Sequence, residues 1–376
     1  CQGTWVTPVR IGFTEWMPWR ESCTQMERAN FVVEYNKGCW TMTDLCAAFG
    51  VSRKTGYKWL SRYQSEGLAG LADQSRAPEK QPQRTSPELE RQIVAVRERY
   101  STWGGKKVLA WLQRHRPEEE WPSRTTVEAV LKRHGLVRER KRRRRCTPSA
   151  KPIVDAGSPN DLWCADYKGW FRLGNGVRCD PLTITDACSR LLIECRAMVK
   201  PQLGDVQAQF ELAFRKFGLP QKMLTDNGPP FGSTGLAGLT RLSVWWIRLG
   251  IEPVRIEPGK PQQNGIHERM HGTLLEVTDT PKPTLKAQQR AFHKFRQTFN
   301  EERPHEALGM LTPTDIYQPS PRSMPSKLPE IEYPDDFQRR RVRENGSFKW
   351  HRVPISANIA LANQDVGLVE VGDGVW

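Results

Sequence analysis

Several features that define other classes of protein are missing from this sequence. Its nine cysteines form no Cys-x-x-Cys pair and no regular spacing, which argues against a disulfide scaffold and against a cysteine-based zinc site. No apolar run approaches the length of a membrane span, and no basic-then-apolar signal sequence opens the chain. We therefore interpret the cysteines as reduced packing residues of a cytoplasmic protein that has no membrane partner.

The length and composition indicate a folded, multidomain chain. With 376 residues, 38% hydrophobic residues and 14 tryptophans, two or three domains can each form a core. The sequence starts at Cys1, so we expect either a fragment or a start drawn too early, with Met17 or Met26 the more natural starts. The last domain looks cut short at Trp376.

The positive charge is concentrated in the first part of the chain. Residues 1–150 hold 28 Lys+Arg against 16 Asp+Glu, a net of +12 out of the total of +15, which leaves +3 for the other 226 residues. Clustered cations neutralise phosphates, whereas catalysis on a metal needs local acids. The asymmetry favours a nucleic-acid-binding front half joined to a more neutral body over a basic face kept for solubility.

Three short helices are predicted between residues 25 and 66. The third follows a tight turn at Gly50 and opens with Ser52 as N-cap, with Tyr57, Trp59 and Leu60 expected to point inward. This order is typical of a helix-turn-helix, whose last helix enters the major groove, and a plain three-helix bundle is the alternative. The side chains expected on DNA are those of Arg53, Lys54, Lys58 and Arg62.

A second helical unit and a basic run follow a Gly- and Pro-rich stretch. Ser86-Pro-Glu-Leu-Glu90 is a strong helix start, and a later helix beginning near Arg124 completes a second helix-turn-helix or a bracing unit. Residues 137–145 then carry seven cations and one acid. Such a run repels itself, so it is expected to lie along a phosphate backbone through Arg142, Arg143 and Arg144, with a solvated linker as the alternative.

From residue 160 the hydrophobic period changes toward two. Strands are predicted over 162–171, 182–186, 191–199, 223–225 and 251–256, and helices over 207–217, 242–249, 262–275 and 285–300. The order suggests an α/β fold: a mixed five-stranded sheet with flanking helices, close to the ribonuclease H arrangement. Residues 337–376 alternate like a small β-domain.

Three acids in this region could perform phosphodiester chemistry. Asp166 lies in the first strand, Asp226 just past a short buried strand, and Glu268 on a helix, so the fold can bring them together. Two Mg²⁺ ions held by carboxylates, with Mn²⁺ able to substitute, would neutralise the attacking and leaving oxygens. Asn264, Glu268 and His271 share one helix face, and Leu275 is expected to continue that face into the core. DNA contacts are expected from Lys260, Gln262, Asn264, Arg269 and His271, with His267 flanking them.

These motifs resemble those of bacterial insertion-sequence transposases with a retroviral-integrase-type core. The resemblance rests on Trp163-x-x-Asp166, on Thr225-Asp-Asn-Gly-x-x-Phe231 and on Pro261-x-x-Asn-Gly-x-x-Glu-Arg269, which occur in order. It implies a DDE transposase in which Asp166 bridges two metals while Asp226 and Glu268 each hold one. It also implies binding of double-stranded DNA at element ends and target, assembly as a homo-oligomer on DNA, a nucleoid location and no small-molecule substrate.

The expected domains follow from these features. They are an irregular segment (1–24), a helix-turn-helix domain (25–66), a linker (67–85), a second helix-turn-helix domain (86–136), a basic linker (137–159), the catalytic core (160–318), a linker (319–336) and the β-domain (337–376).

Other interpretations stay open at this stage. A DNA-binding regulator derived from a transposase would share the helical domains but lack catalysis, and a ribonuclease H-type nuclease would share the core. Asp186 is a rival metal ligand, although it is more typical of a strand end. His267 and His271 without a neighbouring cysteine are a weak indication of zinc. Residues 232–238, rich in glycine, are expected to form a flexible loop beside the site.

Overall fold

The computed structural model describes residues 23–74, 84–137, 156–233, 235–257 and 259–376. The chain divides into two compact units, Cys1–Arg84 and Thr85–Trp376, and each is treated separately. Residues 1–22 and most of the expected basic linker, including Arg142, Arg143 and Arg144, lie outside the described part. Among the described helices, none is long and apolar enough to cross a membrane.

The first unit is a three-helix domain in which the turn residues cap the helices. Its helices are α1 (Thr24–Asn36), α2 (Met42–Ala48) and α3 (Arg53–Glu66). The hydroxyl of Thr41 accepts a hydrogen bond from the Asp44 amide, and Ser52 accepts one from Thr55, so both helix starts are satisfied. Gly50 takes a φ of 63° between α2 and α3. The expected helix-turn-helix arrangement is confirmed.

Two expectations for this unit are wrong. Tyr57 is 50% exposed rather than inward, because the buried positions of α3 are Gly56 and Leu60. The stretch after α3 is not all linker: Gly67–Leu71 forms a 3₁₀ helix, and Leu71 is fully buried with its carbonyl bound to Arg28. An apolar leucine five residues past the helix end was the signal for this extension.

Gly56 provides a stability test of the first unit. A Cβ at this position would lie 2.6 Å from the Cys46 Sγ and 2.9 Å from the Phe31 ring. Gly56→Ala is therefore expected to lower the free energy of unfolding by roughly 1–3 kcal/mol through overpacking, although alanine normally stabilises a helix. Gly272→Ala, with open space around its Cβ on another helix, should be neutral or stabilising. Equal behaviour of the two variants in thermal melts would contradict the packing.

The second unit begins with three more helices around their own core. These are α4 (Pro87–Arg99), α5 (Gly105–His115) and α6 (Arg124–Arg133), packed on Trp103, Val108 and Val127. Ser86 caps α4 with Pro87 in the first turn, as expected. Polar contacts join these helices to the following core: Thr102 with Glu276 at 2.7 Å, Lys106 with Glu306 at 3.1 Å, and Arg114 with Asp315.

A five-stranded mixed sheet forms the centre of the second unit. Its strands are β1 (Leu162–Tyr167), β4 (Leu182–Asp186), β5 (Leu192–Arg196), β6 (Lys222–Thr225) and β7 (Glu252–Arg255), in the order β5-β4-β1-β6-β7. β4 is antiparallel to β1 and β5, whereas β6 is parallel to β1 and β7. This is the ribonuclease H-like arrangement predicted from the sequence.

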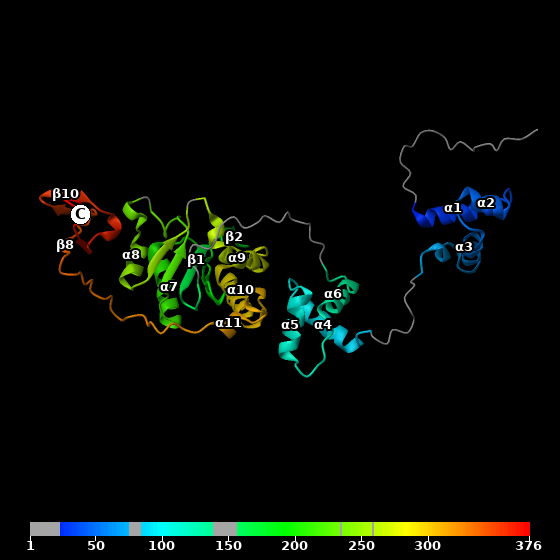
Figure 1. Ribbon diagram of the computed structural model, residues 1–376, viewed down its shortest axis with the longest axis horizontal. Coiled ribbons are helices and arrows are strands. Elements are labelled where there is room, and N and C mark those ends of the chain that lie inside the picture. The colour runs from blue at the N-terminus through cyan, green and yellow to red at the C-terminus, as the bar shows by residue number, and fades with distance from the viewer. Residues whose placement is uncertain (1–22, 75–83, 138–155, 234, 258) are drawn as a thin grey trace, which may run out of the picture. The chain divides into compact units, whose positions relative to one another are not determined.

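Helices cover both faces of this sheet (Figure 1). On one face, α7 (Leu203–Phe217) and α8 (Arg241–Arg248) pack through Phe210, Phe214 and Trp246 against alternate strand residues such as Trp163 and Ala165. On the other face, α9 (Gly265–Thr278) and α10 (Leu285–Gln297) pack around Met270, Leu274 and Phe292. A strand that is buried on both faces has a nearly continuous apolar sequence, and the sequence of β1 predicts a strand for this reason.

The core also contains shorter elements, among them β2 (Phe171–Arg172), β3 (Arg178–Cys179), a π-helical turn (Thr298–Glu302) and α11 (Pro313–Ile316).

Three details of the core differ from expectation. The first strand ends at Tyr167 rather than at Phe171, because Gly169 turns the chain with a φ of 88° and β2 pairs with β3 instead. The helix expected to begin at Gln262 begins at Gly265, after a 3₁₀ turn over Pro261–Asn264. Leu275 is 40% exposed, because the inward face of α9 is His267, Met270, Leu274 and Thr278.

The C-terminal part contains four short strands, as the alternating pattern predicted. They are β8 (Gln338–Arg341), β9 (Ser347–Trp350), β10 (Val353–Ser356) and β11 (Asp365–Leu368), paired as β9 with β10 and β8 with β11. The expected linker before them is partly fixed to the core: the Arg322 side chain donates to the carbonyls of Leu249 and Gly250.

Candidate active site

Two of the candidate acids leave the sheet side by side. β1 and β6 run parallel with Ala165 opposite Thr225, so the next residues on the two strands are Asp166 and Asp226. Neighbouring strands lie roughly 4.8 Å apart, which puts the two carboxylates within reach of one ion. Alternation along β1 places Ala165 under α7 and α8, and therefore Asp166 on the opposite face.

The charges of the other two candidate acids act on the Asp166 carboxylate. Burial first, and then the negative charges of Asp226 and, less strongly, of Glu268, together raise the pKa of Asp166 to about 7, against an opposing hydrogen bond from the Tyr167 amide. Glu268 is on the exposed side of the first turn of α9. Three carboxylates that repel one another are the arrangement that a divalent cation would relieve.

A buried network of threonines and histidines supports the site from α9. The Thr183 hydroxyl donates to the carbonyl of Asp166 at 3.0 Å, so its oxygen accepts from the Nε2 of His267 and of His271 at 2.8 and 2.7 Å. The hydroxyl of Thr185 then donates to the His267 Nδ1 at 2.7 Å. α9 is thereby fixed to β4, directly beside the strand that carries Asp166.

Both histidines of this network are neutral near pH 7. Burial lowers the pKa of His267 well below its usual range, and it lowers the pKa of His271 to about 4 with help from the charge of Lys168. They therefore add no positive charge to offset the carboxylates. Their ring nitrogens and a carboxylate oxygen of Asp166 lie within 4.8 Å of one another, a spacing that could hold a metal, although His267 already uses both nitrogens.

Two oxygens near the acids have no partner among the described residues. They are Oδ1 of Asp226 and Oδ1 of Asn264, both buried. A buried oxygen without a donor costs roughly 1–3 kcal/mol, more if it is charged, so a water or a cation would stabilise each. For Asp226, which follows β6 beside Asp166, a hard divalent cation fits this observation.

Thr183 offers a test of the network. Thr183→Val keeps the shape of the side chain but removes the acceptor of two imidazole N–H groups, so the free energy of unfolding should fall by roughly 1–3 kcal/mol. Thr183→Ser keeps the hydroxyl and should retain most of the stability. Chemical denaturation of the two variants measures the difference, and equal loss in both would assign the effect to packing alone.

The residues expected on DNA are not all free to bind it. Arg53, Lys54, Lys58 and Arg124 are exposed, although Arg124 pairs with Glu128 at 2.8 Å. Lys260 is exposed and pairs with Glu257, while Gln262 and Arg269 are exposed. Arg62 lies over the Trp59 ring at 5.1 Å.

Three side chains, on α9 and on the 3₁₀ turn before it, are not accessible to DNA. Asn264 is 5% exposed, His271 is bound to Thr183, and His267, considered as a phosphate ligand from the sequence, is fully buried. Asn264 belongs to the 3₁₀ turn before α9, so of the expected helix face only Glu268, His271 and Leu275 lie on α9, and Leu275 is exposed instead of entering the core. We do not retain Asn264, His267 or His271 as DNA contacts.

Hydrogen bonds within the core bear on Asp186 and on the glycine-rich segment. Asp186, the rival metal ligand, is fully buried and accepts from the Asn160 amide, the Ser189 amide and the Ser189 hydroxyl, so it is a structural strand end. In the segment expected to form a flexible loop, the Ser233 amide donates to the Gly238 carbonyl, which also accepts from Arg255. Sequence reasoning missed Thr183 and Thr185, although polar residues at i and i+2 in a buried strand signal a shared polar face.

Known protein families match two parts of the chain. Residues 156–261 and residues 249–313 each match an integrase core domain. Residues 27–79 match a helix-turn-helix domain, and residues 55–131 match a homeodomain-like domain.

Curated relatives come from bacterial insertion elements. An uncharacterized protein of insertion element IS407 from Burkholderia multivorans is 25% identical over 254 residues, which are 66% of this chain and 87% of that protein. An uncharacterized protein of IS476 from Xanthomonas euvesicatoria is 27% identical over 68% of this chain and 72% of its own length. Transposase InsD of insertion element IS2 from Escherichia coli is 26% identical over 57% of this chain and 73% of its own length.

Viral integrases are found among similar solved structures. The HTLV-2 integrase catalytic core domain in complex with magnesium is 21% identical over 44% of this chain and 100% of that chain, with a TM-score of 0.34. A simian T-cell lymphotropic virus intasome in complex with PP2A regulatory subunit B56 gamma is 17% identical over 70% of this chain and 85% of that chain, with a TM-score of 0.38.

Proposed function

We propose that the chain cuts and joins DNA at Asp166, Asp226 and Glu268. The family matches and the insertion-element relatives support this proposal, because they indicate a bacterial transposase with an integrase-type core, which is a polynucleotidyl transferase. The reaction is cleavage at the ends of the element followed by attack of the freed 3′-hydroxyl on target DNA. The observation that carries the proposal is the register of β1 and β6, from which Asp166 and Asp226 emerge as neighbours.

The carboxylates of Asp166, Asp226 and Glu268 would hold the divalent metal. Mg²⁺, or Mn²⁺ in its place, supplies charge neutralisation on the attacking and leaving oxygens when bound. The chain's own part is positioning. The hydrogen bond from the Tyr167 amide orients the Asp166 carboxylate, and the Thr183 network holds α9, and with it Glu268, over β1 and β4.

The DNA-binding role falls to the first helical unit. The first turn of α3 exposes Arg53 and Lys54, and Lys58 follows one turn later, as on a helix that enters the major groove at the terminal repeats. The second helical unit, through Arg124, is proposed to contact flanking phosphates. A homo-oligomer that holds two element ends and a nucleoid location complete the proposal.

Strand-transfer products are the direct test of this function. The full chain is incubated with linear DNA that carries the repeats flanking its gene, with supercoiled target DNA and with Mg²⁺. We expect joined products that are absent when EDTA replaces the metal. End binding without any cleaved or joined product at any divalent metal would instead indicate a DNA-binding regulator.

The recognition helix has its own test. Replacing Arg53 and Lys54 with alanine is expected to weaken binding to a repeat-end probe roughly tenfold, because two phosphate or base contacts are lost. Lys37→Ala, which removes an exposed lysine of α1's C-cap paired with Glu34, is the matched control and should bind normally. Mobility-shift titrations in EDTA measure both variants. Unchanged binding by the double variant would remove α3 from the interface.

A further inference from the structure

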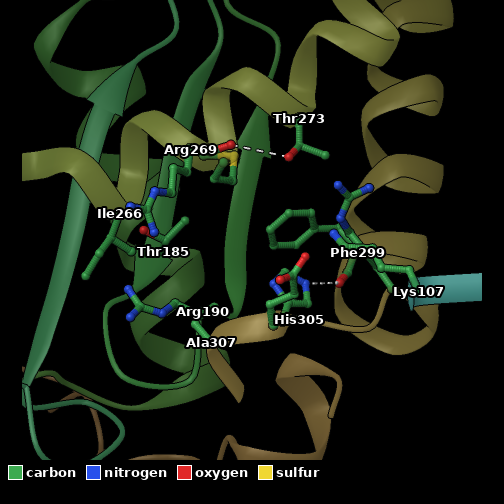
Figure 2. Close-up of a pocket in the computed structure, with 12 residues that line it drawn as sticks. Lys107, Thr185, Arg190, Ile266, Arg269, Thr273, Phe299, His305 and Ala307 are labelled. Carbon is green, nitrogen blue, oxygen red and sulfur yellow. Dashed lines mark hydrogen bonds between the residues drawn. The ribbon is translucent and has the colours of Figure 1, made fainter. Parts of the chain in front are cut away.

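A cavity lies beside α9, and none of the three acids lines it. It has a volume of about 210 Å³ and is enclosed by α9, by the end of β4 with its following turn, by residues 299–307 and by the first turn of α5. Figure 2 shows Arg269 and Thr185 on one side, Arg190 below and the Phe299 and His305 rings opposite. All of these belong to the second compact unit.

The lining of this cavity is strongly positive. Four permanent cations line it, namely Lys107, Arg190, Arg269 and Arg303, against one carboxylate, Glu306. Glu306 is already paired with Lys106 at 3.1 Å, and Arg303 has Glu276 at 3.3 Å outside the lining. An excess of cations around a partly enclosed space is costly unless an anion enters it.

The cations of the cavity repel one another. Burial lowers the pKa of Arg190, and the charge of Arg269 lowers it further. Burial lowers the pKa of His305 to about 4, against a hydrogen bond with the Phe299 carbonyl, and the charges of Lys107, Arg303 and Arg190 contribute to the fall. His305 is therefore neutral and adds no further positive charge to the cavity.

One guanidinium nitrogen in the cavity has no partner. Nη1 of Arg190 is buried and makes no hydrogen bond to any described residue. Guanidinium groups present paired N–H donors that match phosphate oxygens, and they are less strongly hydrated than ammonium groups. The cavity has room for a phosphate group with a few waters, since each water takes about 30 Å³.

We propose that this cavity binds a phosphate group through Arg190, Arg269 and Arg303, and that the group is a backbone phosphate of the DNA on which the site acts. The identification as DNA rests on the proposed function. Arg269 directly follows Glu268 on α9, its exposed side chain lying about 100° further round the helix axis, so the DNA strand would continue round α9 from the acids to the cavity. Lys107 comes from α5, so the same phosphate would also tie the second helical unit to the core.

The test measures DNA and phosphate binding with Arg190→Gln in the full chain. Binding to a duplex is measured in EDTA over a series of salt concentrations, so that it is independent of catalysis. We expect Arg190→Gln to weaken binding about tenfold and to lower the salt slope by about one, as for one lost phosphate contact. Arg290→Gln, an exposed arginine of α10 away from the cavity, is the control and should change neither quantity.

A second arm identifies the source of the phosphate. Potassium phosphate, compared with potassium chloride at equal ionic strength, should raise the melting temperature of the wild type and of Arg290→Gln but not of Arg190→Gln. Arg269→Gln, which changes an exposed side chain, repeats the test if Arg190→Gln folds poorly. Loss of both effects in these variants supports the proposal.

Two other outcomes would contradict the proposal that the cavity binds a DNA phosphate. If phosphate stabilisation is lost but DNA binding and its salt slope are unchanged, the cavity serves a free phosphate-bearing ligand and not DNA. If neither changes, the cavity is not an anion site. Failure of strand transfer with normal DNA binding in EDTA would instead count against the proposed catalysis and leave the phosphate site standing.

Discussion

Asp226→Asn is expected to lower the rate of strand transfer by roughly a thousandfold while leaving DNA binding intact. The substitution keeps the size of the side chain but removes the negative charge that would hold a divalent cation next to Asp166. Metal-based charge stabilisation is worth several kcal/mol, and roughly 4 kcal/mol corresponds to a factor of about a thousand. The rate of product formation at saturating Mg²⁺ measures the loss.

A matched control separates the charge at this position from charge in general. Asp205→Asn makes the same chemical change at an exposed position in the first turn of α7, and its rate should equal that of the wild type. Mobility shifts in EDTA should be the same for all three proteins. If Asp226→Asn joins DNA as fast as Asp205→Asn, the catalytic assignment fails.

Asp166→Asn is expected to stabilise the metal-free protein while it abolishes strand transfer. The pKa of Asp166 is raised from 3.8 to about 7, chiefly by burial and then by the charge of Asp226, so the ionised carboxylate is unfavourable in the fold. The difference corresponds to at most roughly 4 kcal/mol of unfolding free energy. Asparagine cannot ionise, and its side-chain oxygen can still accept from the Tyr167 amide.

The stability that Asp166→Asn gains over the wild type should depend on pH. In the wild type, the folded state holds the Asp166 proton more tightly than the unfolded state, so this contribution to stability is fully present below about pH 4 and is lost as the pH rises to about 7. The advantage of Asp166→Asn should therefore be small at pH 4, grow up to pH 7 and stay constant above. Denaturant titrations in EDTA measure it. An advantage of equal size at pH 4 and pH 8 would show that the proton on Asp166 is not the cause.

Mg²⁺ should reverse the order of stability. A ligand that binds only the folded state stabilises it by mass action, and the wild type has the carboxylate that the variant lacks. Added metal is expected to raise the melting temperature of the wild type more than that of Asp166→Asn. No metal-dependent change in the wild type would contradict a cation site.

The sequence allowed the sheet and its acids to be predicted because both depend on local patterns. β1 and β4 are apolar runs with Asp at or near their ends, whereas the parallel pairing of β1 with β6 joins strands that β4, β5 and α7 separate in the chain, and it was not predicted. The end of β1 was misplaced because apolar residues continue past Tyr167, while the turn at Gly169 is decided by the positive φ that glycine allows.

The details of α9 were harder because they depend on the phase of the helix. The expected face began at Asn264, which instead lies in the 3₁₀ turn before α9, and the sequence does not say which face of the helix meets the core. Packing decides this: Leu274 and Met270 enter the cluster around Phe292, so Leu275 is left outside. The Thr183 and His267 pair and the cavity around Arg190 join residues more than 80 positions apart, and no local period reveals such contacts.

Direct binding of Mn²⁺ tests the central claim that Asp166, Asp226 and Glu268 form a divalent-metal site. The measurement is a titration of Mn²⁺, followed by electron paramagnetic resonance, into the wild type, Asp166→Asn, Asp226→Asn, Glu268→Gln and the control Asp205→Asn. We predict bound Mn²⁺ in the wild type and the control, and at least about tenfold weaker binding in each of the three site variants. Equal Mn²⁺ binding by all five proteins would contradict the claim.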